Sequence, residues 1–404
     1  MEESFPSKLA CIVCGAVGGA LLAYLAMESR VVGRLISPLS TSHPNATYSD
    51  LIGDTRLIRI SSLSLATGCE ILGKAEFLNP GGSGKDRVAL AVLEEAEKSG
   101  KLTPGGMLIE GTSGSTGISL TLLARSRGYR SRIFLPSDQS PEKAALLRRL
   151  GAEVVETPPV SIVHPEHYVN QARASAARTP NSVFVNQFEN PMNTIAHYSS
   201  TGPEIWRATR GRVDAFVMGA GTGGTVGGVG RYLKETSRGK VKVFLVDPPG
   251  SVLLRLVTKG VAWAPQLAER TLQRCRDDTI VEGVGLDRVT SNVRTALPYL
   301  DGAWGVEDEE VVAMARHLLR EDGIFCGSST ALNCVGAVKA ARALGPGHTV
   351  VTILCDGGAR HLSRFWSDEK VVEAGKKRGD RALQEVLAKA GVKDSVLRHW
   401  RAAV

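Results

Sequence analysis

The alternation of strand-like and helix-like segments is the feature that most constrains this fold. Short apolar runs recur between residues 70 and 355, and amphipathic stretches with helical periodicity separate them. This order favours parallel pairing and predicts an α/β fold, with helices covering both faces of the sheets. The predicted strands are 70–75, 107–110, 132–136, 153–156, 182–185, 215–218, 242–247 and 350–355, and the clearest helices are 87–99, 117–127 and 140–150.

Length and composition indicate a globular protein. A chain of 404 residues can form two lobes around one site. The net charge of +8 is scattered, and only 5% of residues are aromatic, which argues against nucleic-acid binding. The seven cysteines are an odd number and lie mostly in apolar runs, so we interpret them as reduced core residues. The Cys11-x-x-Cys14 pair has no second pair or histidine cluster beside it, and no metal site is predicted.

An apolar segment near the N-terminus predicts a membrane anchor. Residues 9–27 carry no charged side chain and are just long enough to span a bilayer. Arg30 and Arg34 follow this segment and favour keeping the rest of the chain on the cytoplasmic side. We therefore expect residues 1–45 to form an uncleaved anchor and a linker, with the catalytic part facing the cytoplasm.

Lys85 is the first candidate for chemistry. It follows Pro80 in a turn that contains Gly81, Gly82 and Gly84, where a ligand can approach the backbone closely. A partly desolvated lysine can lose its proton near neutral pH and form a Schiff base with a carbonyl compound, including pyridoxal phosphate. This segment alone also fits an ordinary exposed loop lysine.

A second glycine-rich segment follows the predicted strand 215–218 and opens a helix. Backbone amides, two threonine hydroxyls and the helix N-terminus can together hold a phosphate group. A dinucleotide site is the alternative, because 219–224 also fits G-x-G-x-x-G with Asp247 downstream. A dinucleotide would leave Lys85 without a role, whereas a phosphate-bearing aldehyde uses both segments. The predicted phosphate-binding residues are Gly221, Thr222, Gly223, Gly224 and Thr225.

Three further segments place polar groups where predicted strands end or helices begin. The run from Glu110 to Gly117 supplies hydroxyls and free amides that suit a carboxylate. Gln187 comes directly after a strand, where parallel sheets collect ligand groups. Ser328 or Ser329 precedes a helix and, taken alone, fits a simple helix cap.

Together these motifs resemble the cysteine synthase and cystathionine β-synthase family, the β-replacing branch of fold-type II pyridoxal phosphate enzymes. The resemblance runs from about residue 50 to 365. The Gly-Ser-Thr-Gly run at 114–117 and the apolar N-terminus are also similar to membrane-anchored fungal cysteine-synthase-like proteins, which implies a homodimer in a membrane such as the mitochondrial outer membrane. The matching segments are 51–57, 79–87, 112–117, 186–193, 201–206, 221–225 and 327–329.

The resemblance implies a role for each candidate residue. Lys85 would form the Schiff base with the cofactor, Gly221 to Thr225 would hold its phosphate, and Ser329 would face its pyridine nitrogen. Ser115 stands where the family usually has an asparagine that contacts the ring oxygen. The substrate carboxylate would be held by Thr112, Ser113, Thr116 and Gln187.

The implied activity is pyridoxal-phosphate-dependent β-replacement, which makes L-cysteine from O-acetylserine and sulfide through an aminoacrylate. The alternatives are cystathionine β-synthase-type replacement with a larger thiol, a serine or threonine dehydratase, and a non-catalytic membrane-tethered homologue. The implied fold has a smaller substrate-binding lobe at 76–190 and a larger cofactor-binding lobe at 46–75 and 191–366, each with a mostly parallel sheet. A helical tail is predicted at 367–404.

Overall fold

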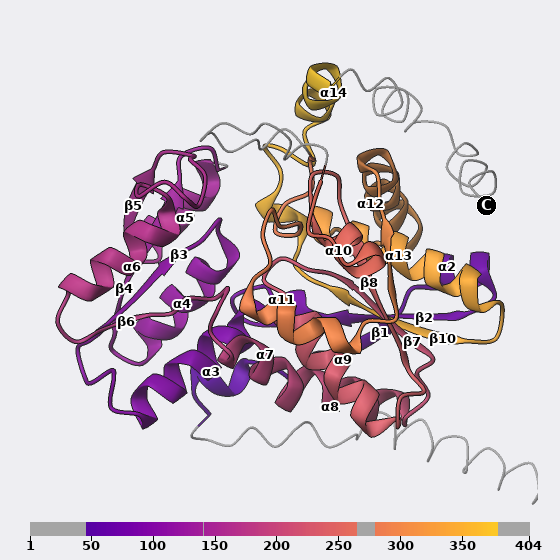
Figure 1. Cartoon of the computed structure of the whole chain (residues 1–404), viewed down its shortest axis with the longest axis horizontal. Helices are drawn as coiled ribbons and strands as arrows, with labels where there is room; N and C mark the ends of the chain where they lie inside the picture. The colour runs from indigo at the N-terminus through magenta and orange to yellow at the C-terminus, as the bar shows by residue number, and fades with distance from the viewer. Residues whose placement is uncertain (1–45, 140, 265–278, 379–404) are drawn as a thin grey trace, which may run out of the picture. The chain divides into compact units, whose positions relative to one another are not determined.

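The computed structural model describes residues 46–139, 141–264 and 279–378, and those from Tyr48 onward belong to one compact unit (Figure 1). The strands are β1 (Leu57–Arg59), β2 (Glu70–Ala75), β3 (Met107–Gly111), β4 (Arg130–Pro136), β5 (Glu153–Thr157), β6 (Ser182–Phe184), β7 (Ala215–Gly219), β8 (Lys242–Asp247), β9 (Gly302–Gly305) and β10 (Thr349–Leu354). The helices are α2 (Ser61–Thr67), α3 (Lys85–Lys98), α4 (Ser115–Ser126), α5 (Pro141–Arg149), α6 (Tyr168–Arg178), α7 (Met192–Ala196), α8 (Gly202–Thr209), α9 (Gly224–Thr236), α10 (Leu253–Lys259), α11 (Ser291–Ala296), α12 (Asp308–Asp322), α13 (Ser328–Leu344) and α14 (Asp368–Arg378).

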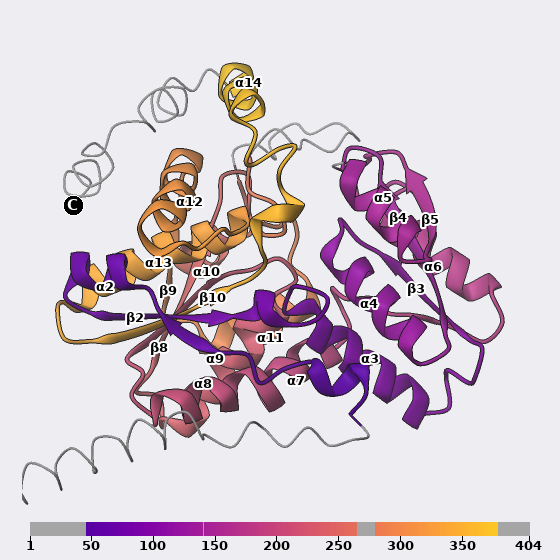
Figure 2. The same ribbon diagram turned by 180° about the vertical axis from the view of Figure 1, so that it is seen from behind.

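The larger sheet has six strands in the order β1-β2-β10-β7-β8-β9. All neighbours pair in parallel except β1, which runs antiparallel to β2. Strand β7 alternates between two cores: Ala215 and Val217 pack with α12 and α13, whereas Phe216 and Met218 pack with α9. Figure 1 and Figure 2 show these helices on opposite faces of the sheet. The sheet is therefore buried on both sides, as the apolar runs predicted.

The smaller sheet has four parallel strands in the order β5-β4-β3-β6. Its central strand β3 also alternates, since Leu108 packs against the α3 and α4 cluster while Met107 and Ile109 pack toward α6. All four strands fall within residues 76–190, and the six strands of the larger sheet fall outside that range. The division of the unit into two lobes with those boundaries stays a prediction.

The predicted strands are present, with ends shifted by at most two residues. The sequence missed β1 and β9, because strands of three and four residues show too little periodicity to be recognised. Two helices start earlier than predicted: α3 begins at Lys85 and α4 begins at Ser115. These two candidate site residues therefore lie at helix N-termini rather than in loops.

The predicted membrane-anchored location needs correction. In the part of the chain that the structure describes, no helix is long and apolar enough to cross a membrane. The longest described helix, α13, has 17 residues, and at about 1.5 Å per residue it is shorter than the roughly 30 Å hydrocarbon core. The segment proposed as the anchor, residues 9–27, lies outside the described residues.

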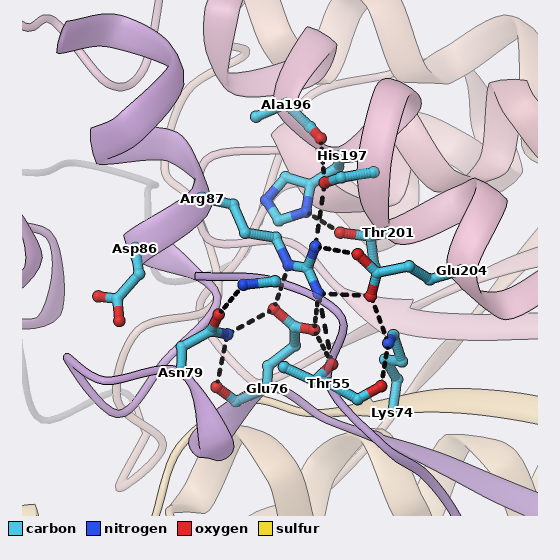
Figure 3. Close-up of polar contacts among 12 residues, drawn as sticks. Thr55, Lys74, Glu76, Asn79, Asp86, Arg87, Ala196, His197, Thr201 and Glu204 are labelled. Carbon is cyan, nitrogen blue, oxygen red and sulfur yellow. Dashed lines mark hydrogen bonds and ion pairs between the residues drawn. The ribbon is translucent and has the colours of Figure 1, made fainter. Parts of the chain in front are cut away.

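A buried cluster of charges joins the start of α3 to the larger sheet (Figure 3). The Arg87 guanidinium donates to Glu76 at 2.8 and 2.9 Å and to Glu204 at 2.6 and 2.8 Å. Lys74 on β2 donates to the same Glu204 carboxylate at 2.5 Å. The Arg87 and Glu76 side chains are 3% and 1% exposed. Two cations balance two carboxylates, so the cluster avoids the large cost of an uncompensated buried charge.

We expect the substitution Arg87→Leu to lower the free energy of unfolding by about 3–5 kcal/mol, because it leaves two buried carboxylates with too few donors. Urea unfolding followed by circular dichroism measures this. Arg148→Leu is the matched control, because Arg148 pairs with Glu156 at the surface and its loss should cost no more than about 1 kcal/mol. Equal losses in the two variants would contradict a special role for the buried cluster.

Candidate active site

The carboxyl ends of strands from both sheets meet at one cavity of about 290 Å³. The segments after β3 and β6 enter it from the smaller sheet, and those after β7 and β10 enter it from the larger one. The cavity brings together eleven of the twelve predicted site residues, and Gly224 is the one outside its lining. The predicted residues in the lining are Lys85, Thr112, Ser113, Ser115, Thr116, Gln187, Gly221, Thr222, Gly223, Thr225 and Ser329.

Lys85 presents a free amine to this cavity. No described residue forms a hydrogen bond or an ion pair with its Nζ, and its backbone amide donates to Ser83 Oγ at 3.3 Å. Burial lowers the pKa of the Lys85 ammonium, although the nearby Cys355, Asp356 and Glu76 oppose that shift. The positive end of α3 adds to the lowering. An amine with a lowered pKa and no partner suits nucleophilic attack on a carbonyl group.

The glycine loop after β7 forms a cradle at the N-terminus of α9. Gly223 has φ of +91°, a conformation that favours glycine. A Cβ atom at Gly221 would lie 2.1 Å from the carbonyl oxygen of Gly283, so a side chain does not fit there. Gly224 begins α9 just behind the cavity, and a Cβ there would meet the Asn193 side chain at 2.0 Å. The loop therefore keeps its amides close to the cavity, where they suit a phosphate.

The hydroxyls of the cradle are held from behind. Asn193 Nδ2 donates to Thr222 Oγ1 at 2.9 Å, and His197 Nε2 lies 3.0 Å from Thr225 Oγ1. Burial, with the positive charges of Arg87 and Lys85, lowers the pKa of His197 well below its usual value, so the ring is neutral. The cradle thus contains no side-chain cation, and its attraction for an anion comes from amides, hydroxyls and the helix dipole.

The loop that opens α4 lies against Gln187. Thr116 Oγ1 donates to Gln187 Oε1 at 2.6 Å, and Gln187 Nε2 donates to the carbonyl of Gly111 at 3.2 Å and to Glu110 at 3.4 Å. These bonds fix which side of the Gln187 amide faces Thr116. Glu110 is fully buried, which raises its pKa to about 8 and keeps it mostly protonated at neutral pH.

Near the start of α13, the cavity contains a cysteine that the sequence analysis did not place there, Cys355. Ser329 lies beside the thiol of Cys355, and Asn333 Nδ2 donates to Cys355 Sγ at 3.3 Å. Cys355 was interpreted as a core residue, but it lines the cavity because it directly follows β10. Its position after a parallel strand was a signal that could have identified it. The described thiols Cys69, Cys326 and Cys334 are buried and free, as predicted, and the other three cysteines lie outside the described residues.

Sequence reasoning missed a charged cluster in the cavity wall. Lys143 on α5 pairs with Glu282 at 2.6 Å, and Glu282 also contacts His361 at 2.9 Å. These three residues come from segments that are far apart in the sequence, so no local pattern marks them. Only the packing of α5 beside the 279–290 segment brings them together.

The donor set fits pyridoxal phosphate. The cavity offers a free amine for the aldehyde, a glycine and threonine cradle for the phosphate, and a serine hydroxyl at the start of α13 for the ring. The loop at 112–116, which was predicted to bind a carboxylate, also lines the cavity. A dinucleotide would give no role to Lys85 or to this loop.

Comparisons with known proteins agree with this fit. The family model described as pyridoxal-phosphate dependent enzyme matches residues 48–356. Cysteine synthase 2 of Schizosaccharomyces pombe is 52% identical over 91% of this chain and 95% of its own length. A putative mitochondrial cysteine synthase of Saccharomyces cerevisiae is 44% identical over 88% of this chain and 91% of its own length. The crystal structure of an O-acetylserine dependent cystathionine β-synthase from Helicobacter pylori aligns with a TM-score of 0.67 and 32% identity, covering 79% of this chain and 97% of that one.

We expect Glu110 to make stability fall as the pH rises. Its pKa of about 8 exceeds the unfolded value near 4.5, so between these values the folded state binds the extra proton. Across that window, the contribution of Glu110 to the free energy of unfolding falls by about 1.4 kcal/mol for each unit of pH increase. Urea unfolding between pH 5 and pH 8 should therefore show a shallower decline for Glu110→Gln than for the wild type.

The exposed carboxylate Glu153 provides the control, and Glu153→Gln should follow the wild-type pH profile. If Glu110→Gln also ran parallel to the wild type, Glu110 would not be protonated in the folded protein.

Proposed function

The chain belongs to the family of pyridoxal-phosphate-dependent enzymes that includes the cysteine synthases, and from this membership we propose that it makes L-cysteine from O-acetylserine and sulfide. The observation that carries the proposal is one cavity lined by the Lys85 amine, the glycine cradle at 221–225 and the hydroxyl-rich loop at 112–116. Relatives named cysteine synthase at 44% and 52% identity over most of the chain support the choice of substrates.

Each group of residues in the cavity would have its own role in binding the cofactor. Lys85 would hold the cofactor through its amine, and the amides of 221–225 with Thr222 and Thr225 would bind the phosphate. Pyridoxal phosphate, when bound, supplies an electron sink that stabilises negative charge at the substrate Cα. Ser329 would face the pyridine nitrogen, where a neutral hydroxyl favours its protonation less than a carboxylate would.

The loop that opens α4 would orient the substrate. Thr112, Ser113 and Thr116 with Gln187 would bind the carboxylate of O-acetylserine, helped by the positive end of α4. In the structure Thr116 and Gln187 bond to each other, so each must exchange that bond for one to the substrate. Ser115, the first residue of α4, would contact the cofactor ring with a shorter side chain than the family's usual asparagine.

Lys85 would also move the proton. With the cofactor held in the cavity and the substrate bound, Lys85 Nζ would take the proton from the substrate Cα. The lowered pKa of Lys85 increases the share of its neutral, basic form. Acetate leaves as the Cβ–O bond breaks, sulfide forms the new Cβ–S bond, and Lys85 returns the proton to Cα.

The homodimer predicted from the sequence is part of this proposal. Residues 48–52 and helix α7 both pack against the apolar side of α3. Each carries an exposed apolar side chain: Leu51 is 60% exposed and Ile195 is 46% exposed. Leu78, which precedes α3, is also exposed at 53%. A second copy of the chain would bury such side chains.

We expect the purified full-length protein, reconstituted with pyridoxal phosphate, to show a visible Schiff-base absorbance and to form L-cysteine from O-acetylserine and sulfide. Lys85→Ala should lose that absorbance band and on the order of 10³-fold in rate, because it removes both the attachment point and the base. Absorbance spectra and a cysteine assay measure the two effects.

Lys98→Ala is the control, since Lys98 lies exposed at the far end of the same helix and should change neither readout. Pyruvate in place of cysteine, with sulfide present, would identify a dehydratase. An unaltered spectrum in Lys85→Ala would show that Lys85 does not form the Schiff base.

A further inference from the structure

The Glu282 carboxylate is surrounded by cations inside the cavity wall. Lys143 Nζ lies 2.6 Å from Glu282 Oε2, and His361 Nδ1 lies 2.9 Å from the same oxygen. Arg364 Nη1 lies 3.6 Å from the other oxygen, Oε1. Three cationic side chains thus converge on one carboxylate. Its backbone is held too, because the Glu282 amide donates to Ser328 Oγ at 2.9 Å.

Three members of this group are buried, whereas Arg364 is 34% exposed. The Lys143 and Glu282 side chains are each 9% exposed, and His361 is 5% exposed. Burial alone would lower the pKa of His361, but the Asp356 and Glu282 carboxylates, one at each ring nitrogen, raise it to about 9. His361 therefore remains a cation at neutral pH. Removing Glu282 would take away the carboxylate that Lys143, His361 and Arg364 share, while Asp356 would still face His361.

These charges line the same cavity as Lys85. Lys143, Glu282, His361 and Arg364 all contribute to its wall, together with Thr112 to Thr116 and Gln187. The first substrate's carboxylate already has a site in that loop. The cations around Glu282 therefore form a second carboxylate-binding arrangement in the cavity, and an internal side chain fills it.

We propose that Glu282 determines the choice of the second substrate: it fills a cationic subsite that would otherwise bind the carboxylate of an incoming thiol. This inference rests on the proposed β-replacement, in which a C–S bond replaces the C–O bond of O-acetylserine and acetate leaves with the thiol proton. A tethered carboxylate fills the subsite without the entropy cost that a free ligand pays on binding. It also repels a second carboxylate. Sulfide and thiols without a carboxylate do not compete with Glu282 for the subsite.

A purely structural role makes a different prediction. If the Lys143–Glu282 pair only tied α5 to the 279–290 segment, its loss would disturb the cavity for every nucleophile alike. A charge-selective subsite instead separates anionic organic thiols from neutral ones. The comparison of two thiols of similar size but different charge therefore distinguishes the two roles.

The experiment measures kcat/KM of the cofactor-loaded full-length protein with O-acetylserine and three nucleophiles: sulfide, neutral 2-mercaptoethanol and anionic 3-mercaptopropionate. In the wild type, we expect the anionic thiol to be at least about 10-fold poorer than the neutral one, since like charges repel. Glu282→Ala should raise the ratio of anionic to neutral thiol at least about 10-fold. Calorimetry should show unreactive propionate binding the variant at least about 10-fold more tightly than the wild type.

Two variants serve as controls. Glu153→Ala removes an exposed carboxylate that pairs with Arg132 outside the cavity lining, and it should leave the thiol ratio unchanged. Adding Lys143→Met to Glu282→Ala should return the ratio toward the wild-type value. If Glu282→Ala does not fold, Glu282→Gln keeps the volume, removes the charge and should shift the ratio in the same direction.

Three results would overturn the inference. These are a wild type that uses both thiols equally well, a Glu282 variant that changes all three nucleophiles by the same factor, and propionate binding that does not respond to the substitution. A wild type that makes no cysteine from sulfide would instead overturn the proposed function. Cysteine synthesis with an unchanged thiol ratio would overturn this inference alone.

Discussion

The ion pairs of Arg87 with two buried carboxylates are the interaction on which the site depends most. Arg87 lies two residues after Lys85 on α3, and its partners Glu76 and Glu204 stand in η2 (Glu76–Leu78) and α8, with Lys74 of β2 completing the cluster. Buried charges tolerate little displacement, because losing a partner leaves an uncompensated charge in a poorly polarisable interior. The cluster therefore fixes the start of α3, and with it the lysine amine, relative to the larger sheet that carries the phosphate cradle.

Helix N-termini supply much of the electrostatic character of the cavity. Helices α3, α4, α9 and α13 begin at Lys85, Ser115, Gly224 and Ser328, at or beside the same cavity. Each brings amides that have no partner within the helix and a partial positive charge, which together favour a phosphate and a carboxylate. Where Lys143, His361 and Arg364 gather in the wall, Glu282 neutralises much of their charge.

Local sequence patterns predicted most of the fold and most of the candidate site. The strand runs were recognisable because the central strands of both sheets are buried on both faces, which favours continuous apolar residues. The glycine loop, the 112–117 run and Lys85 were recognisable because each is a short contiguous motif at a strand end or helix start. Cys355 was misassigned because its apolar neighbours suggested a core, although its place after β10 exposes it to the cavity. Strands β1 and β9 were missed because they are too short to show a period.

The sequence by itself determined the secondary structure, the class of fold and the chemistry of each loop, because these depend on residues that are near one another along the chain. The tertiary structure alone decided which loops share a cavity, that Arg87 pairs with Glu204, and that Lys143 and His361 surround Glu282. Those contacts join residues more than 75 positions apart, and they form only when the two sheets pack together. Charge compensation in a buried site is a property of that packing, and no local pattern encodes it.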